Sequence, residues 1–196
     1  MGQGVFLVWT YGSIIEAKGN TFRNVSRNSI ESLENYCDER KSGMVIITDN
    51  RIITPTTGCS YPDASSYPNG IVAGWFLDLS AGMDPARNSK IIIMNNYIET
   101  SGELSSGVIG LADGMTIVNN EIVLSGSQSR AILQFGSGGL IAGNILKGTG
   151  AYAFMALPYE NELKGNGNTF LRNDIQLFTP LKADFLSEGN DNIYIK

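Results

Sequence analysis

Carboxylate, aromatic and arginine side chains gather in the first half of this sequence, and together they are residue types that bind sugars. Aromatic rings stack on the apolar faces of sugars, and carboxylates hydrogen-bond sugar hydroxyls. The candidates are Glu31, Glu34, Tyr61, Tyr67, Trp75, Phe76, Asp78, Asp84 and Arg87. These residues predict glycan binding. The alternative is that the aromatic rings pack under their own loops and the charges are solvated.

Two of these carboxylates could hydrolyse a glycosidic bond. A glycosidase needs two carboxyl groups about 5 to 9.5 Å apart across the bond that breaks. Asp78 could pair with Glu31, Glu34 or Asp84, since paired strands place side chains about 5 Å apart. Acidic residues are common, so the pattern allows this activity without assigning it.

A polysaccharide lyase is the other catalytic alternative. It needs a base to remove the proton beside a uronate carboxylate, and a cation to neutralise that carboxylate. Arg40, Lys41 and Arg87 could take part, and Asp38 with Glu39 could hold Ca²⁺. The alternative for residues 38–41 is an exposed charged turn. Beyond Ca²⁺, the sequence suggests no cofactor and no metal ligands.

The cysteine and histidine content limits the chemistry further. The chain has no histidine and two cysteines, Cys37 and Cys59, so a zinc site is not expected. The two cysteines either form a disulfide or stay as separate thiols. The sequence leaves both states open.

Charge and hydropathy argue against nucleic-acid and membrane partners. The net charge is -5, and no run of basic residues provides the footprint that phosphate binding needs. The longest early apolar run, Val5–Trp9, is too short to span a membrane and lacks the basic start of a signal peptide.

A repeat in the sequence predicts the strands and turns that must position these side chains. Asn96, Asn120, Asn144 and Asn168 follow one another at intervals of 24 residues, each after an Asn or Gly and two positions before an apolar residue. The same motif, which we call the corner word, occurs at Asn20 and Asn50, and a less regular copy lies at 189–190. A period in the low twenties predicts a solenoid. Stacked asparagines would form an amide ladder at one corner.

Two families of short strands accompany the repeat. The residues five and three positions before each repeated Asn are mostly apolar and alternate with mixed residues, as in a strand with one buried face. They are Ile15/Ala17, Val45/Ile47, Ile91/Ile93, Met115/Ile117, Gly139/Ile141, Leu163/Gly165 and Phe185/Ser187. A preceding family, which we call the first sheet, covers Val5–Trp9, Ile30–Leu33, Ile71–Leu79, Val108–Leu111, Ala131–Phe135, Tyr152–Leu157 and Ile175–Phe178.

The apolar residues that follow the repeated Asn should form one buried column. These residues are Phe22, Ile52, Ile98, Ile122, Leu146 and Phe170. The expected fold is therefore all-β: a single domain over residues 1–196, with three parallel strands per coil and about seven coils.

Irregular spacing points to the functional region. The Asn interval widens to 30 residues between Asn20 and Asn50 and to 46 between Asn50 and Asn96. The insertions lie at 35–43, 55–69 and 80–90. Loops on both sides of the first sheet would form the two sides of a groove over it. We expect Asp78 and Phe76 to point outward, because burying Asp78 is costly. Outward aromatic residues on later coils would extend the groove: Tyr152, Phe154 and Phe178.

Through these corner words the chain resembles the right-handed parallel β-helix proteins of the pectin-lyase-like superfamily. The resemblance covers nearly the whole chain and matches no specific enzyme family. It implies a right-handed single-stranded parallel β-helix, an extended polysaccharide in the groove, and an extracellular or cell-surface location, with a cytoplasmic one not excluded. The histidine-containing sites, the paired-Asp words and the Arg-rich signature of its pectin-degrading members are missing.

Three functions follow from these expectations. The first is a carbohydrate-binding β-helix module, without evident catalysis, with its groove over the first sheet near coils 2–3. The second is a polysaccharide lyase or glycoside hydrolase, or part of one. The third is a structural spike or adhesin segment. Because neither terminus shows a capping helix, we also expect a fragment of a longer β-helix, or end-to-end self-association.

Overall fold

The computed structural model describes residues 4–9, 13–35, 43–56, 67–77, 90–159, 163–176 and 179–196. These described residues form strands and contain no helix. The first sheet contains β1 (Val5–Trp9), β4 (Asn28–Asn35), β7 (Asn69–Leu77), β10 (Ser106–Gly110), β13 (Arg130–Gln134), the end of β15 (Ile145–Ala156) and β18 (Thr179–Ser187).

Two further sheets complete the stack. The second sheet contains β2 (Ile14–Lys18), β5 (Met44–Thr48), β8 (Lys90–Met94), β11 (Thr116–Val118), β14 (Leu140–Ala142), β16 (Thr169–Leu171) and β19 (Ile193–Ile195). The third contains β3 (Thr21–Arg23), β6 (Arg51–Ile53), β9 (Tyr97–Thr100), β12 (Glu121–Leu124), the start of β15 and β17 (Asp174–Ile175).

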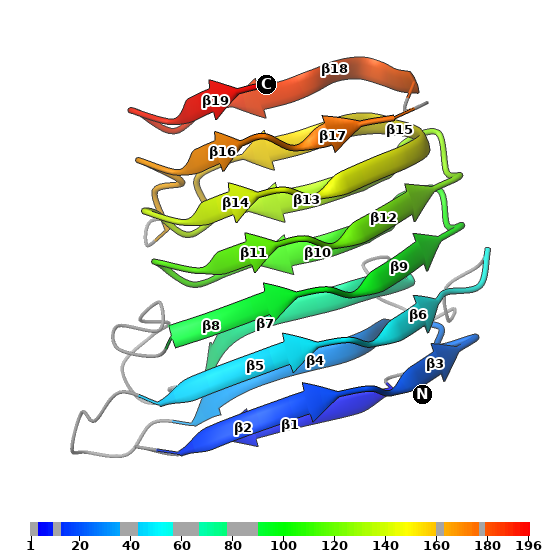
Figure 1. Cartoon of the computed structure of the whole chain (residues 1–196), viewed down its shortest axis with the longest axis vertical. Helices are drawn as coiled ribbons and strands as arrows, with labels where there is room; N and C mark the ends of the chain where they lie inside the picture. Colours follow the sequence, from blue (N-terminus) through cyan, green and yellow to red (C-terminus); the bar gives the residue numbers. More distant parts are fainter. Residues whose placement is uncertain are drawn as a thin grey trace.

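The chain visits the three sheets in a fixed order and then repeats the circuit. Strands of successive circuits lie above one another along the long axis of the molecule (Figure 1). Every strand pairing within the sheets is parallel, for example β8 with β11 and β11 with β14. β15 is long enough to run from the third sheet into the first, so that it pairs with both β12 and β13. The expected all-β architecture of parallel sheets is confirmed, and it is consistent with a parallel β-solenoid.

Each sheet contributes one column of apolar residues to a continuous core. In the third sheet, Ile52, Ile98, Ile122 and Leu146 are adjacent in register and fully buried. The column of the second sheet runs through Ala17, Ile47, Ile93, Ile117, Ile141, Phe170 and Tyr194. That of the first sheet runs through Val5, Ile30, Ile71, Val108, Ile132, Phe154 and Phe185. Their burial supplies the hydrophobic stabilisation that short strands lack individually.

An asparagine ladder follows the corner between the second and third sheets. The backbone N–H and side-chain Nδ2 of Asn96 both donate to Oδ1 of Asn120, at 3.0 and 2.9 Å. Asn120 donates in the same way to Asn144 at 2.9 and 3.0 Å. The full ladder is Asn20, Asn50, Asn96, Asn120, Asn144 and Asn173. The ladder satisfies buried amide groups that would otherwise destabilise the fold.

The residue before each ladder asparagine makes the corner. Gly19, Asp49, Asn95, Asn119, Gly143 and Arg172 all have positive φ, between 50° and 67°. Gly and Asn adopt this left-handed backbone at low cost, which explains why the corner word usually contains them.

The fourth asparagine of the regular interval does not belong to this ladder. Asn168 lies at the corner between the first and second sheets, where its Oδ1 accepts from Gly139 N at 2.7 Å. Its backbone N–H donates to Asn192. The ladder continues instead from Asn144 to Asn173, 29 residues later. The expected column is therefore wrong at its last member, because Phe170 faces the core from the second sheet and Ile175 pairs with Leu146.

The strands expected after Asn144 are also displaced in the structure. Residues 175–178 were expected in the first sheet, but Ile175 ends β17 of the third sheet and the first-sheet strand is β18. Phe185 accordingly faces the core from the first sheet, although the repeat had placed it in the second. Leu163, expected in a second-sheet strand, forms an isolated antiparallel bridge with Tyr159. A segment between β15 and β16 accounts for the longer circuit.

Candidate binding groove

The outward face of the first sheet carries an apolar column. Its apolar members are adjacent in register: Val72, Ile109, Leu133, Met155 and Leu186, with Glu31 next to Val72 in the same row. Val72 is 3% exposed and Leu133 is 8% exposed, although both point away from the main core. Apolar burial on an outward face identifies a covered or hollowed surface rather than a solvated one.

A cavity of about 400 Å³ lies over this face. Its size falls within the range of small-ligand sites, about 300 to 1,000 Å³. The aliphatic floor consists of Val72, Ile109, Leu111 and Leu133. Around the floor are Arg27, Asn28, Asn69, Phe135 and Tyr159. We call this cavity the groove.

The aromatic side of the groove is built by the segment that follows β15. Tyr159 and Leu163 exchange backbone hydrogen bonds at 3.0 and 3.2 Å, which closes a tight bridge after β15. The Tyr159 ring packs on Phe135, with centroids 5.0 Å apart and planes at 59°. Together with Val72, Ile109, Leu111 and Leu163, these rings form a second apolar cluster, separate from the main core. The insertion therefore places an aromatic pair beside the aliphatic floor.

The polar side of the groove is an amide network at the start of β4 and β7. Asn28 Nδ2 donates to Glu31 Oε2 at 2.8 Å, and Asn69 Nδ2 donates to Asn28 Oδ1 at 3.0 Å. Asn69 Oδ1 accepts in turn from Ser106 N at 2.8 Å. Both asparagines are buried, whereas the neighbouring Arg27 is exposed. The network orients the amides through three adjacent strands.

The structure places part of the predicted site near this groove. Glu31 lies on the outward column next to Val72 and is buried, with Asn28 donating to its carboxylate. Tyr67 is half-buried just before β7. Glu34 and Phe76 are register partners in β4 and β7, and Trp75 pairs with Leu33. The side chains of Glu34, Trp75 and Phe76 are not among those described.

The remaining predicted residues lie outside the described residues. They are Tyr61, Asp78, Asp84 and Arg87, with the Ca²⁺ candidates Asp38 and Glu39, the cysteines Cys37 and Cys59, and Phe178. The strand expected over 71–79 spans 69–77. The expected phase of Phe76 and Asp78 therefore stays a prediction.

One of the aromatic residues expected to point outward on later circuits is buried instead. Phe154 is fully buried in the core, where its ring packs 5.2 Å from that of Phe170. Tyr152 is half-buried, and Lys182 Nζ lies 5.7 Å from its ring centroid. The error is one of phase: Phe154 pairs with Ile132 of the inward column, and Met155 next to it lies on the outward face.

Sequence reasoning missed most of the groove lining. Ile109, Leu111, Leu133 and Phe135 were not among the predicted binding residues, because those were expected where the 24-residue spacing is interrupted. A signal was present: outward positions of a solvated sheet should be polar, yet this column is aliphatic. The amide rim had no such signal, since Asn28 and Asn69 resemble ordinary turn residues.

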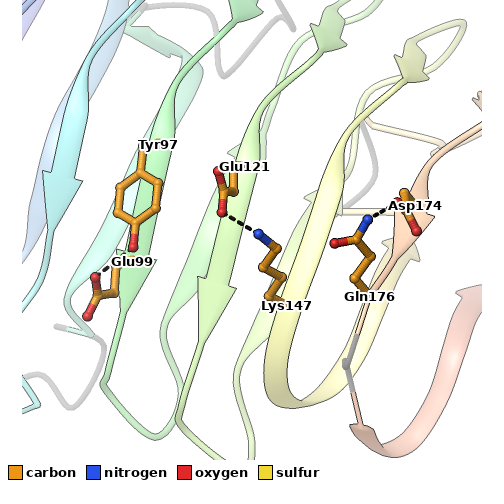
Figure 2. Close-up of polar contacts among 6 residues, drawn as sticks. All are labelled: Tyr97, Glu99, Glu121, Lys147, Asp174 and Gln176. Atoms are coloured by element: carbon orange, nitrogen blue, oxygen red, sulfur yellow. Dashed lines mark hydrogen bonds and ion pairs between the residues drawn. The ribbon is translucent and has the colours of Figure 1, made fainter.

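The outward face of the third sheet is different in character. Arg51 lies over the Tyr97 ring, 4.3 Å from its centroid, and Tyr97 Oη donates to Glu99 Oε2 at 2.9 Å. Lys147 pairs with Glu121 at 2.7 Å. Figure 2 shows the Tyr97–Glu99 and Lys147–Glu121 contacts, with Asp174 and Gln176 hydrogen-bonded further along the face. On this face Lys147 and Glu121 form an ion pair, and the charges of Glu99 and Arg51 contact Tyr97.

Tyr97 is the titratable group of that face with a displaced pKa. Burial raises the pKa of Tyr97 above its ordinary value of 10.0, and the hydrogen bond to Glu99 raises it further. The charge of Glu99 acts in the same direction, while Arg51 opposes it. The phenol is thus held in its neutral form as a donor to Glu99.

Within the described residues, no group of three or more His, Cys, Asp or Glu side chains could hold a metal ion. In the same part of the chain, no helix is long and apolar enough to cross a membrane.

Comparison with known proteins gives no assignment. No protein-family model matches the sequence, and neither the curated proteins nor the solved structures compared with it yield a match.

Proposed function

We propose that this chain is a carbohydrate-binding module, and that the groove over the first sheet holds an oligosaccharide. The finer description of the fold is part of the proposal: a right-handed parallel β-helix of about seven coils, similar to those of the pectin-lyase-like superfamily. Right-handedness is supported by the strong bias of crossover connections between parallel strands. The seven strands of the second sheet support the number of coils.

The observation that carries the proposal is the pairing of aromatic rings with amides in one cavity. Sugar rings have an apolar face of C–H groups and a periphery of hydroxyls. The half-buried Phe135 and Tyr159 rings offer a surface for the first, and Asn28, Asn69 and Arg27 offer hydrogen bonds for the second. The third-sheet face is a poorer candidate, because the Tyr97 hydroxyl and the Lys147 ammonium group there already hydrogen-bond to carboxylates of the same face.

Binding is favoured over catalysis by what lines the groove. The described lining residues include no carboxylate, and the nearby Glu31 is engaged by Asn28. Hydrolysis needs two carboxyl groups at the scissile bond. The lyase, hydrolase and spike or adhesin alternatives therefore have no specific observation in their favour, and an extracellular or cell-surface location stays part of the proposal.

A glycan array tests the proposal directly. The wild-type chain should retain at least one class of oligosaccharide, and Phe135→Ala should weaken that binding about fivefold, since stacking on an aromatic ring contributes about 1 kcal/mol. Tyr97→Ala is the matched control, because it removes an aromatic ring from the outward face of the third sheet and leaves the groove intact.

Three outcomes would count against the proposal. They are no retained glycan, equal loss in both variants, or loss that follows unfolding measured by circular dichroism. Appearance of new reducing ends or unsaturated ends during incubation, with or without Ca²⁺, would favour the enzyme alternative instead.

A further inference from the structure

We infer that the groove recognises an acyl group on its sugar, namely an acetyl group carried on nitrogen or oxygen. This inference rests on the proposed glycan binding and specifies the ligand further. It follows from two features of the groove: the kind of hydrogen-bonding group at its polar side, and the absence of any such group on its floor.

The polar side offers donors. Each asparagine NH₂ carries two hydrogens. One hydrogen of Asn28 is used by Glu31 and one of Asn69 by Asn28, which leaves one N–H of each amide without a partner among the described residues. Both amide oxygens already accept a hydrogen bond. Arg27 adds a guanidinium, which has donors only. The free donors at this side therefore favour an acceptor on the ligand.

The floor offers no hydrogen bond at all. Val72, Ile109, Leu111 and Leu133 present only aliphatic carbon to the cavity. A sugar hydroxyl placed against them would lose its water and gain no partner, which is unfavourable. A methyl group placed there would bury apolar surface, which is favourable. The part of the ligand that covers the floor must therefore be apolar.

An acetyl group has both properties within a few bonds. Its carbonyl oxygen accepts hydrogen bonds but donates none, so it matches Asn28, Asn69 and Arg27. Its methyl group matches the aliphatic floor next to them. A free hydroxyl matches the floor poorly, and a uronate carboxylate would satisfy the donors but leave the floor uncovered. The combination selects acylated sugars over both.

Matched glycan pairs separate acetyl recognition from glycan binding in general. The first pair is N-acetyl-chito-oligosaccharide and cello-oligosaccharide, which share one backbone and differ at the 2-position. The second is O-acetylated xylan and the same xylan after alkaline removal of its esters. The two pairs are printed on a broad array that includes acetyl-free uronate polymers. We expect acetylated glycans to bind about tenfold or more tightly than their acetyl-free partners.

Arginine variants locate the recognition. Arg27→Gln should remove most of the preference for the acetylated member of a pair, because it takes a charged donor from the groove. The matched control is Arg51→Gln, an exposed arginine on the third-sheet face, which should keep the preference. Both positions are exposed, so both variants should fold, and thermal unfolding checks this.

Each outcome decides the inference. Retained glycans without preference for the acetylated partner, or a stronger response to acetyl-free uronates, would overturn acetyl recognition and leave the proposed glycan binding intact. A preference that survives Arg27→Gln unchanged would contradict the role of Arg27 as a donor to the acyl oxygen and also overturn the inference. An array with no retained glycan would overturn the proposed function itself, and this inference with it.

Discussion

The first and third sheets have the same parallel pairing and face the same core, yet their outward faces differ in kind. On the third sheet several outward residues are polar or charged and contact one another, as Lys147 does with Glu121 and Tyr97 with Glu99 (Figure 2). On the first sheet they are aliphatic, and a cavity lies over them. A scaffold face needs solubility, whereas a binding face needs apolar surface that is kept from solvent. The difference therefore identifies the first sheet as the side to test for a ligand.

The largest effect should come from the shared core. Ile122→Ala removes a fully buried side chain and should lower the free energy of unfolding by about 2–4 kcal/mol. Val123→Ala, on the outward face of the same strand, should cost about 0.5 kcal/mol. Urea denaturation measures both. A loss below about 0.5 kcal/mol for Ile122→Ala would mean that the register of the third sheet is wrong.

A somewhat smaller loss is expected on the first-sheet outward face. Leu133 belongs to the apolar column but borders the cavity, so part of the space that Leu133→Ala creates is open to the groove. We expect a cost of about 2 kcal/mol, near the low end for a buried leucine. The test is to compare the free energies of unfolding of Leu133→Ala and Val123→Ala by denaturant titration. Equal losses in the two variants would remove the distinction between the two outward faces.

The ion pair of the third-sheet face should contribute little. The side chains of Lys147 and Glu121 are 36% and 37% exposed, so solvent screens their attraction. A double-mutant cycle with Lys147→Met and Glu121→Gln should give a coupling of about 0.5 kcal/mol that disappears in high salt. A coupling several times larger and insensitive to salt would show that this face is more than a solvated scaffold.

The smallest effect concerns the titration of Tyr97. Its pKa is raised in the folded chain by burial and by Glu99, so the folded state holds the phenolic proton more tightly than the unfolded state. The resulting stabilisation is fully present below pH about 10 and is lost as the pH rises through the raised folded pKa.

The titration is read as the difference in tyrosinate absorbance between wild type and Tyr97→Phe. Glu99→Gln should bring the pKa of Tyr97 down towards its ordinary value. An unchanged pKa in that variant would contradict the role of Glu99.

The sequence predicted the fold well where local chemistry and packing agree. Asn96, Asn120 and Asn144 have the corner word, the spacing and the apolar residue two positions later, and all three take their expected places. Alternation with period two likewise identified the inward residues of β5, β8 and β11.

The error at Asn168 has a physical cause. Left-handed residues stand at two different corners of the circuit. Gly167-Asn168 occupies the corner between the first and second sheets, where Gly138 takes the same conformation before Gly139. The true ladder position has Arg172 in the left-handed conformation, a residue type that rarely signals it. The segment after β15 shifted the spacing by five residues, and the regular interval of 24 was retained only by coincidence.

By itself, the sequence determined the parallel strands, the asparagine corner and the inward columns, because each is set by residues within one short word. Only the tertiary structure decided which corner Asn168 occupies and which residues line the groove. A ladder contact joins residues 24 or more positions apart, and the groove joins Asn28 to Tyr159. Such contacts depend on how many residues each circuit uses, and local propensity does not fix that number.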